Sequence, residues 1–310
     1  MNDTTSTKLP TRVLGRTGLA VTRLGYGAME LRGQRVWGGR PVTDEQAETI
    51  LNAVLDAGVN WIDTAADYGS SEELIGKFAA ARRSEFILAT KTGCSLIDAG
   101  DHDETPHDFS RDHMIGNIDQ SLRRLKTDKL DFIQIHNPTV AQAEEHRIVD
   151  TLAEICADGT VGSFGISSRS PDLATFIDWN VFDVFQIPYS ALDRGHEDLI
   201  SKAHASGAGV IVRFAGPRRP SGNGLGSQER WDKWQRAGLD ELLADGETRN
   251  RWMLRYLLSH PGIDTVIIGT LSLDHLNQNL SDLAAGPLDD SVYAEAKRRL
   301  DGIGESPEPV

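Results

Sequence analysis

Four titratable side chains stand beside apolar segments in the first half of the chain. Asp63 lies near the end of the run VNWIDTA and Tyr68 follows five positions later, while Lys91 lies in FILATKT and His136 ends LDFIQIH. Carboxylates and phenols next to a hydrophobic core are costly unless a partner pairs with them. Each residue alone has an ordinary structural explanation, so the pattern matters only if the fold brings the four together.

Together, the four residue types suit proton transfer by a tuned phenol. Free tyrosine has a pKa of about 10 and lysine of about 10.4, so neither is poised at neutral pH alone. A neighbouring ammonium stabilises tyrosinate, and a carboxylate keeps that ammonium charged and oriented. An imidazole orients a substrate oxygen or shares the proton. The set therefore predicts Tyr68 as a general acid, supported by Lys91, Asp63 and His136.

Repeating elements must position these groups. Eight short segments of strand type recur, each followed by a turn and a helical pattern: residues 24–30, 59–65, 86–92, 130–136, 161–167, 182–188, 209–215 and 264–270. Eight such units most simply close into an α/β fold, the (β/α)₈ TIM barrel, whose active sites lie at the C-terminal ends of the strands. An open doubly wound sheet is the alternative, but no GxGxxG sequence opens the first strand-to-helix turn.

The flanking segments refine this prediction. LPTRVLGRTGLAVTRLG, before the first strand, predicts an N-terminal β-hairpin that turns at residues 16–18. Thr43 and Gln46 have the spacing of a capping box, directly before a helix with a buried stripe. Three long insertions follow strands one, three and seven, so they should lie at the C-terminal face: residues 31–42, 94–110 and 216–238.

No linker or low-complexity segment divides the chain. We therefore expect one domain over residues 1–310, with frayed ends at about 1–8 and 303–310. The composition, 39% hydrophobic and 25% charged, is typical of a soluble globular protein. A net charge of −14 argues against a nucleic-acid or anionic-membrane partner.

The cellular setting is also suggested by composition. Only two cysteines, Cys94 and Cys156, are present, so no disulfide framework is implied. The first residues lack the apolar run of an export signal, and no segment approaches a membrane span. We expect a cytoplasmic protein that acts on a small molecule, as a monomer or small homo-oligomer.

The motifs DTAADYG, ATKTG and IQIHNP, preceded by LGRTGLAVTRLGYGAM, resemble those of the aldo-keto reductases, over roughly Val13 to Leu283. The resemblance implies a TIM barrel that reduces an aldehyde or ketone to an alcohol, reversibly, with hydride from NAD(P)H. It also implies that the catalytic residues are Asp63, Tyr68, Lys91 and His136, with Tyr68 as the proton donor.

The resemblance carries over to cofactor residues as well. Ser167 and Ser168 match the pair that holds the nicotinamide carboxamide, although the second is usually asparagine, and Gln186 matches the glutamine on the other side. Arg213 stands where an aromatic residue often stacks, and an arginine plane can stack too. The remaining residues implied on this side are Gly27, Ala28, Met29, Asp63, Phe214, Ala215, Gly216 and Arg218.

The segment VIIGTLSLDHLNQNL matches the part of the family that grips the adenosine phosphate. A strand followed by Thr270 and Ser272 at a helix start makes an anion site from free backbone N–H groups. The matching residues are Gly269, Thr270, Ser272, His275, Gln278 and Asn279. Gly269 and His275 replace the basic residues often used for the 2′-phosphate. NADP(H) is therefore our preferred cofactor, and NAD(H) stays open.

Two other features were weighed. Trp37, in the loop after the first strand, either walls the substrate pocket together with Tyr68 and His136 or pins that loop to the barrel. The loop AGDHDETPHDFSRDH contains His102, His107 and His113, but their spacing matches no tight zinc pattern, so no metal site is expected.

Two other functions remain open at this stage. A lysine that ends a barrel strand also suits a Schiff-base aldolase, with Lys91 as the nucleophile. A cofactor-binding barrel could instead serve as a redox-sensing subunit without significant turnover.

Overall fold

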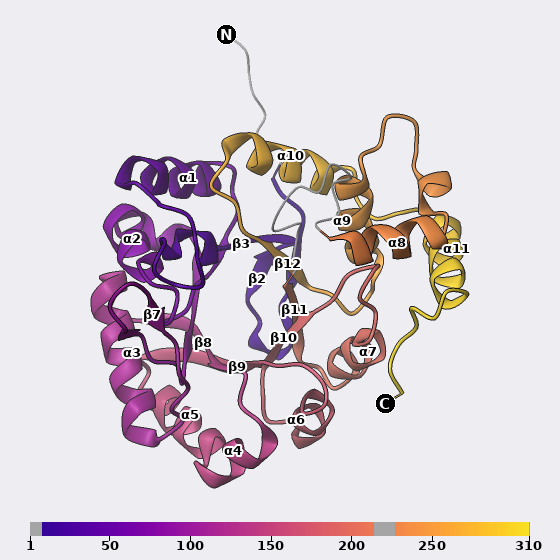
Figure 1. Cartoon of the computed structure of the whole chain (residues 1–310). Helices are drawn as coiled ribbons and strands as arrows, with labels where there is room; N and C mark the ends of the chain where they lie inside the picture. Colours follow the sequence, from indigo (N-terminus) through magenta and orange to yellow (C-terminus); the bar gives the residue numbers. More distant parts are fainter. Residues whose placement is uncertain (1–7, 214–226, 310) are drawn as a thin grey trace.

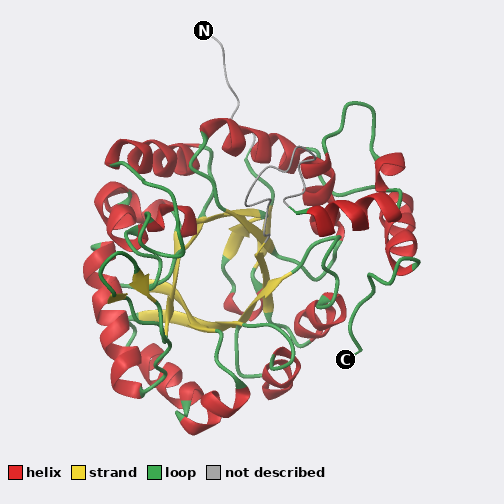
Figure 2. Cartoon of the chain, in the orientation of Figure 1, coloured by secondary structure: helices red, strands yellow, loops and turns green. Residues whose placement is uncertain are grey.

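The structure, a computed structural model, describes residues 8–213 and 227–309. Eight parallel strands close into a barrel, and helices surround it (Figures 1 and 2). Around the barrel the strands follow chain order: β3 (Leu24–Gly27), β4 (Trp61–Asp63), β5 (Ile87–Thr92), β8 (Leu130–His136), β9 (Val161–Ser167), β10 (Val184–Pro188), β11 (Gly209–Arg213) and β12 (Thr265–Ile268). The predicted TIM barrel is confirmed, and every predicted strand contains an observed one.

The helices of the described residues pack outside this sheet. They are α1 (Asp44–Asp56), α2 (Ser71–Phe78), α3 (Arg111–Leu125), α4 (Val140–Glu145), α5 (Ile148–Ala157), α6 (Leu173–Trp179), α7 (Glu197–Ala205), α8 (Gln228–Arg236), α9 (Arg249–Ser259), α10 (Leu273–Ala284) and α11 (Asp290–Asp301). Single 3₁₀ turns are η1 (Gly15–Thr17), η2 (Ala28–Arg32), η3 (Ala80–Glu85) and η4 (Leu239–Leu242). The main apolar core lies between the sheet and this helical layer.

Helix α1 shows how the sequence sets these elements. Thr43 Oγ1 accepts from Gln46 N at 3.2 Å, and Gln46 Oε1 accepts from Thr43 N at 3.1 Å, which forms the predicted capping box. Asp44 and Glu45 follow in the first turn, where negative charge favours a helix start. The apolar stripe behind them is buried against the barrel.

The predicted N-terminal hairpin covers the N-terminal end of the barrel. Strands β1 (Thr11–Val13) and β2 (Ala20–Thr22) pair antiparallel, and Gly18 turns the chain with φ of +72°. Leu14 and Val21 are fully buried in a cluster inside the barrel, which also contains Trp61, Ala89, Phe132, Val184, Ile211 and Ile267. Because this end is filled with apolar side chains, a polar site has to lie at the other end.

Two of the long insertions are joined at the C-terminal face. Residues 94–110 contain a short hairpin, β6 (Ile97–Asp98) and β7 (Asp103–Glu104). Arg35, from the 31–42 insertion, forms ion pairs with Asp98 at 2.6 Å and Asp103 at 2.7 Å. Only residues 227–238 of the third insertion are described, and most of them form α8.

Some boundaries differ from those predicted. The first strand ends at Gly27 rather than residue 30, because the chain turns into η2 at the barrel mouth. The C-terminal tail was expected to fray, but Glu308 N donates to Gly195 O at 3.0 Å and Glu305 pairs with Lys233 at 3.0 Å. These contacts hold residues 303–309 against the barrel side. Residues 1–7 lie outside the described chain.

Across residues 8–213 and 227–309, no helix is both long and apolar enough to cross a bilayer.

Candidate active site

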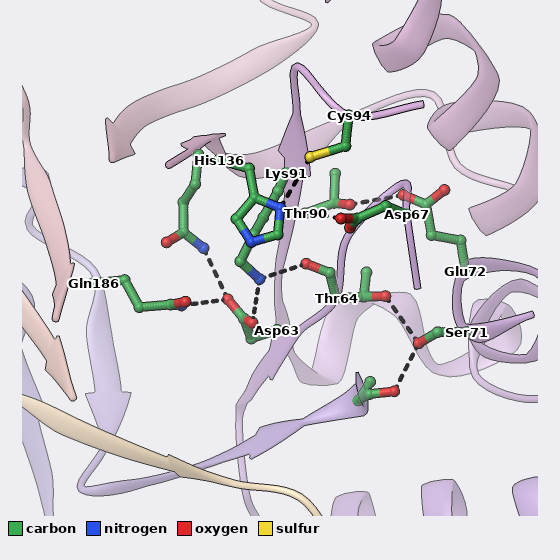
Figure 3. Close-up of polar contacts among 12 residues, drawn as sticks. Asp63, Thr64, Asp67, Ser71, Glu72, Thr90, Lys91, Cys94, His136 and Gln186 are labelled. Atoms are coloured by element: carbon green, nitrogen blue, oxygen red, sulfur yellow. Dashed lines mark hydrogen bonds and ion pairs between the residues drawn. The ribbon is translucent and has the colours of Figure 1, made fainter. Parts of the chain in front are cut away.

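Three of the four proposed catalytic residues come from neighbouring strands at the C-terminal mouth. Asp63 ends β4, Lys91 is the penultimate residue of β5, and His136 ends β8. These strands are paired in parallel, so their C-terminal ends meet at one edge. Figure 3 shows the three side chains directed toward a common centre.

Tyr68 comes from the tight turn between β4 and α2. Its N–H donates to Ala65 O at 3.0 Å, and its carbonyl accepts from Ser71 N at 2.8 Å. The Ser71 hydroxyl lies 2.9 Å from Thr64 Oγ1 and donates to Ala28 O at 2.9 Å (Figure 3). This turn is therefore tied to both neighbouring strands, which fixes the position of the phenol.

Lys91 and Asp63 form a buried ion pair. The ammonium lies 2.5 Å from Asp63 Oδ1 and donates to Thr64 O at 2.8 Å. The lysine side chain is 0% exposed and that of Asp63 2%. Burial acts to lower the pKa of Lys91, but Asp63 and Tyr68 outweigh it, so the pKa is raised. Lys91 is therefore an ammonium at neutral pH.

The second oxygen of Asp63 is held by two amides. Gln134 Nε2 and Gln186 Nε2 each donate to Asp63 Oδ2 at 2.8 Å. Hydrogen-bond donors of this kind offset the cost of burying a polar group. The pair is thus part of a network that extends across the barrel from β4 to β10.

The Tyr68 phenol lies next to this ion pair. Lys91 Nζ is 4.9 Å from the centre of the Tyr68 ring, and the residue is only 8% exposed. Burial raises the pKa of Tyr68, while the Lys91 charge acts to lower it. The net shift is upward, so the phenol keeps its proton at neutral pH and can donate it.

The His136 ring also lies next to Tyr68. The two ring centres are 6.1 Å apart with an interplanar angle of 77°. His136 Nδ1 lies 3.0 Å from Cys94 Sγ and 3.4 Å from Asp67 Oδ2. Although burial acts to raise the pKa of Asp67, its hydrogen bond to His136 and the charges of His136 and Lys91 hold the pKa below its usual range. Asp67 is therefore a carboxylate beside the imidazole.

Gln134, Asp67 and Cys94 were not predicted as part of the site. Gln134 stands two residues before His136 in the same strand, so strand alternation places both side chains on one face. Asp67 directly precedes Tyr68, and Cys94 lies three residues beyond Lys91. The sequence contains these residues, but nothing local shows that Gln134 reaches Asp63 or that Asp67 and Cys94 contact His136.

Trp37 lies beside Tyr68 and also contacts the neighbouring insertion. Its ring lies edge-on to Tyr68, with centres 5.9 Å apart at 76°. Its indole N–H donates to Thr105 Oγ1 at 3.1 Å, which links the insertion after β3 to the one after β5. The residue is 50% exposed, so it is open to solvent as well as to Tyr68.

The residues matched to the nicotinamide end lie on β9, β10 and β11. Ser167 ends β9 and is fully buried, yet its Oγ has no hydrogen-bond partner among the described residues. Ser168 N donates to Gln186 O at 3.1 Å, which keeps Ser168 and Gln186 adjacent. Arg213 ends β11, near enough for its charge to lower the pKa of Tyr68 in part. An unpaired buried hydroxyl beside Gln186 fits a carboxamide ligand.

The residues matched to the phosphate end lie where β12 meets α10. Ser272 is the N-cap of α10, and its Oγ accepts from His275 N at 3.3 Å. Ser272 N donates to Thr270 Oγ1 at 3.0 Å. His275 is exposed in the first turn, and Asn279 lies one turn further, half-buried. A helix start of this kind suits an anion.

Gln278 and Gly269 also lie on this side of the barrel mouth. Gln278 is exposed, and its amide donates to Asp282 at 2.7 Å, one turn further along α10. A Cβ added to Gly269 would lie 2.7 Å from Gly27 O, so only glycine lets these two backbones approach. Ala28 and Met29 follow Gly27 in η2 at the same mouth. Four predicted cofactor residues lie outside the described chain: Phe214, Ala215, Gly216 and Arg218.

Several known proteins are similar to this chain. L-galactose dehydrogenase of Arabidopsis thaliana is 26% identical, over 96% of both chains. 6-Dehydroglucose reductase of Novosphingobium aromaticivorans is 29% identical, over 84% of this chain and 85% of its own. The solved structure of aldo-keto reductase AKR11C1 from Bacillus halodurans (holo form) has a TM-score of 0.80 and 28% identity, and covers 94% of this chain and 96% of its own.

A family profile gives the same result. The model described as "Aldo/keto reductase family" matches residues 23–229, which include the barrel strands from β3 to β11. The neighbouring structures share the closed barrel, and the relatives are dehydrogenases and reductases. The chain belongs to the aldo/keto reductase family and is an NAD(P)H-dependent oxidoreductase.

Proposed function

We propose that this enzyme reduces the carbonyl group of a small aldehyde or ketone to an alcohol, reversibly, with Tyr68 as proton donor. The observation that carries the proposal is the position of Tyr68. The centre of its ring lies 4.9 Å from the Lys91 ammonium and 6.1 Å from the centre of the His136 ring. A carbonyl oxygen near the phenol and the imidazole would accept a hydrogen bond from the Tyr68 hydroxyl and would lie next to the His136 ring.

Each residue then has a distinct role. Tyr68 gives its proton to the carbonyl oxygen, and the Lys91 ammonium stabilises the tyrosinate that remains. Asp63 holds Lys91 charged and in place through the 2.5 Å ion pair. His136, with Nδ1 turned toward Cys94 and Asp67, is left with Nε2 to orient the substrate oxygen.

The residues matched to the cofactor suit a nicotinamide nucleotide. When bound, that group supplies the hydride, which the protein's own side chains cannot provide. The unpaired Ser167 hydroxyl, with Ser168 and Gln186, would hold the carboxamide, and Arg213 would pack nearby. Thr270, Ser272 and the start of α10 would hold the phosphate end. We propose NADP(H) as the preferred form, with NAD(H) as the alternative.

The aldolase alternative is disfavoured by the state of Lys91. A Schiff base needs a neutral amine, but Asp63 keeps the pKa of Lys91 raised. The amine also donates to Asp63 and Thr64, so its free positions are few. The redox-sensor alternative has no observation in its favour, because all four catalytic positions are filled and lie together.

The test is turnover measured by cofactor absorbance at 340 nm. NADPH and NADH are each combined with a panel of aldehydes, ketones and aldoses. Sugars belong in the panel because the names of two relatives refer to L-galactose and 6-dehydroglucose. Carbonyl-dependent oxidation of at least one cofactor is expected. Cofactor binding without turnover across the panel would favour the sensor, and borohydride trapping of substrate on Lys91 would favour the aldolase.

A further inference from the structure

Three metal-ligating side chains meet at one edge of the active site. Cys94 lies just beyond β5, His107 on the returning arm of the 94–110 insertion, and His136 at the end of β8. An antiparallel bridge pairs Cys94 with His107, and the His107 and His136 ring centres are 5.9 Å apart. One ligand atom from each residue lies within 4.8 Å of the other two.

The donor set selects a class of cation. One thiolate and two imidazoles are ligands of Zn²⁺, which prefers four ligands in a tetrahedron. With Zn–S of about 2.3 Å and Zn–N of about 2.0–2.1 Å, the ligand atoms of such a site lie about 3.3–3.7 Å apart. Cys94 Sγ and His136 Nδ1 are 3.0 Å apart, a hydrogen-bond distance. Changes of up to about 1.5 Å in the distances between the ligand atoms would therefore convert the cluster into a three-ligand site.

An independent observation points to a cation at this position. Asp67 is 1% exposed, and its Oδ1 has no hydrogen-bond partner among the described residues. Its Oδ2 lies 3.4 Å from His136 Nδ1, so the unpaired carboxylate oxygen belongs to a group that already contacts the cluster (Figure 3). Lys91, whose charge acts on Asp67, is itself paired with Asp63 at 2.5 Å. The carboxylate can therefore act as a fourth ligand or orient His136.

We propose that Cys94, His107 and His136 bind one Zn²⁺ ion, with Asp67 as the adjacent carboxylate, and that the bound ion inhibits the enzyme. On binding, the Cys94 S–H bond breaks, the Zn–S bond forms, and the proton passes to the buffer. Inhibition follows because the ion draws the His136 ring toward Cys94 and His107, so that Nε2 no longer holds the position from which it meets the substrate oxygen. The inhibition rests on the proposed function, whereas the binding does not.

The sequence alone does not reveal this site, because the spacing of His102, His107 and His113 matches no zinc pattern. The cluster contains only His107 from that loop. Cys94 lies 13 positions before His107, and His136 lies 29 positions after it. His107 is exposed, so the ion has access from solvent, while Cys94 and His136 are buried.

Binding is tested with the full-length protein after treatment with a chelator. Co²⁺ is the spectroscopic probe, because Zn²⁺ has a filled d shell and no visible bands. Wild type should bind one Co²⁺ per chain with a sulfur-to-cobalt charge-transfer band, and calorimetry should show one Zn²⁺ competing for the same site. Cys94→Ser should abolish the band, and His107→Gln should weaken Zn²⁺ binding by about 10-fold or more.

Matched controls separate this site from adventitious binding. His102→Gln alters an exposed histidine of the same loop, and Cys156→Ser alters the other thiol of the chain. Both should keep the band and the Zn²⁺ affinity of wild type. His107 is exposed, so His107→Gln is expected to fold, and a thermal melt checks this. Unchanged metal binding in both Cys94→Ser and His107→Gln, or no sulfur-to-cobalt band in wild type, would overturn the proposal.

Inhibition is a separate measurement. For each variant, turnover with Zn²⁺ is divided by turnover without it, so that any change in basal rate cancels. For wild type the ratio should be about 0.1 or lower and should return to about one after EDTA is added. For His107→Gln the ratio should stay near one. If no carbonyl substrate is found, this ratio cannot be formed, but the cobalt and calorimetry results still decide whether the site exists. A one-to-one Zn²⁺ complex with undiminished turnover would refute inhibition alone.

Discussion

The Lys91 ammonium lies over the face of the Tyr68 ring, 4.9 Å from its centre, and 2.5 Å from the carboxylate of Asp63. A phenol in this position gains two properties. Burial keeps its proton in place at neutral pH, and the fixed positive charge stabilises the anion that forms when the proton leaves. A proton donor for a carbonyl needs both properties.

Tyr68→Phe tests the donor directly. The substitution removes the hydroxyl and keeps the ring that contacts Trp37 and His136. Turnover should fall by roughly 10²-fold or more, as loss of a general acid does, while cofactor affinity stays near the wild-type value. Steady-state kinetics and cofactor fluorescence titration measure the two quantities. Tyr293→Phe, on α11, is the control, and intact turnover in Tyr68→Phe would refute the proton-donor role.

Lys91→Met tests the buried ion pair. The change leaves the Asp63 carboxylate buried without its cation, and broken pairs of this kind lower the free energy of unfolding by about 3–5 kcal/mol. Urea unfolding measures the loss. The double variant Asp63→Asn/Lys91→Met removes both charges, so it should recover most of the stability but no turnover. A double variant as unstable as Lys91→Met would show that the carboxylate is not the cause.

Asp67→Asn tests the residue that positions His136. The carboxylate favours the tautomer with a proton on Nδ1, which leaves Nε2 for the substrate. We expect kcat/KM to fall by about tenfold, with a mixed tautomer population in ¹⁵N NMR of the His136 ring. Asp101→Asn, an exposed carboxylate of the neighbouring loop, is the control. An unchanged tautomer in Asp67→Asn would exclude the positioning role, even if activity fell.

His260 predicts how stability depends on pH. Its ring is 3% exposed, and burial lowers its pKa from the usual 6.5 to about 4. Between pH 6.5 and about pH 4, His260 is therefore protonated in the unfolded chain and neutral in the folded protein. The stability present above pH 6.5 is lost as the pH falls toward 4. Between pH 7 and pH 5 this residue should cost about 2 kcal/mol of unfolding free energy.

Urea unfolding of wild type and His260→Gln at several pH values measures this effect. The variant will be less stable at pH 7, because His260 Nδ1 accepts from Gly262 N at 3.1 Å. Its stability should nevertheless decline less steeply between pH 7 and pH 5. Parallel pH curves for the two proteins would mean that another group accounts for the loss.

His275→Arg tests the orientation of the phosphate end. His275 is exposed in the first turn of α10, where a guanidinium could pair with a 2′-phosphate. The ratio of kcat/KM for NADPH to that for NADH should rise by about fivefold or more. His204→Arg adds the same charge on α7 and should leave the ratio unchanged. An unaltered ratio in His275→Arg would show that this helix start does not face the 2′-phosphate.

The positions of the four proposed catalytic residues could be predicted because they depend on local patterns. Apolar runs identify the strands, and a barrel places the C-terminal ends of all its strands at one mouth. Asp63, Lys91 and His136 stand at or near such ends, so their convergence follows from the fold class alone. The capping box of α1 was predictable for the same reason, since its two partners are three residues apart.

The partners of these residues were decided by the tertiary structure. Asp63 accepts hydrogen bonds from Gln134 and Gln186, which lie 71 and 123 positions further along the chain. His136 contacts Cys94, which lies 42 positions before it. Which side chain reaches which atom depends on barrel closure, strand register and loop conformation. Local periodicity does not contain these quantities, because many loop paths are compatible with the same alternation of apolar and polar residues. Sequence alone therefore located the chemistry, and the folded chain determined what holds it in place.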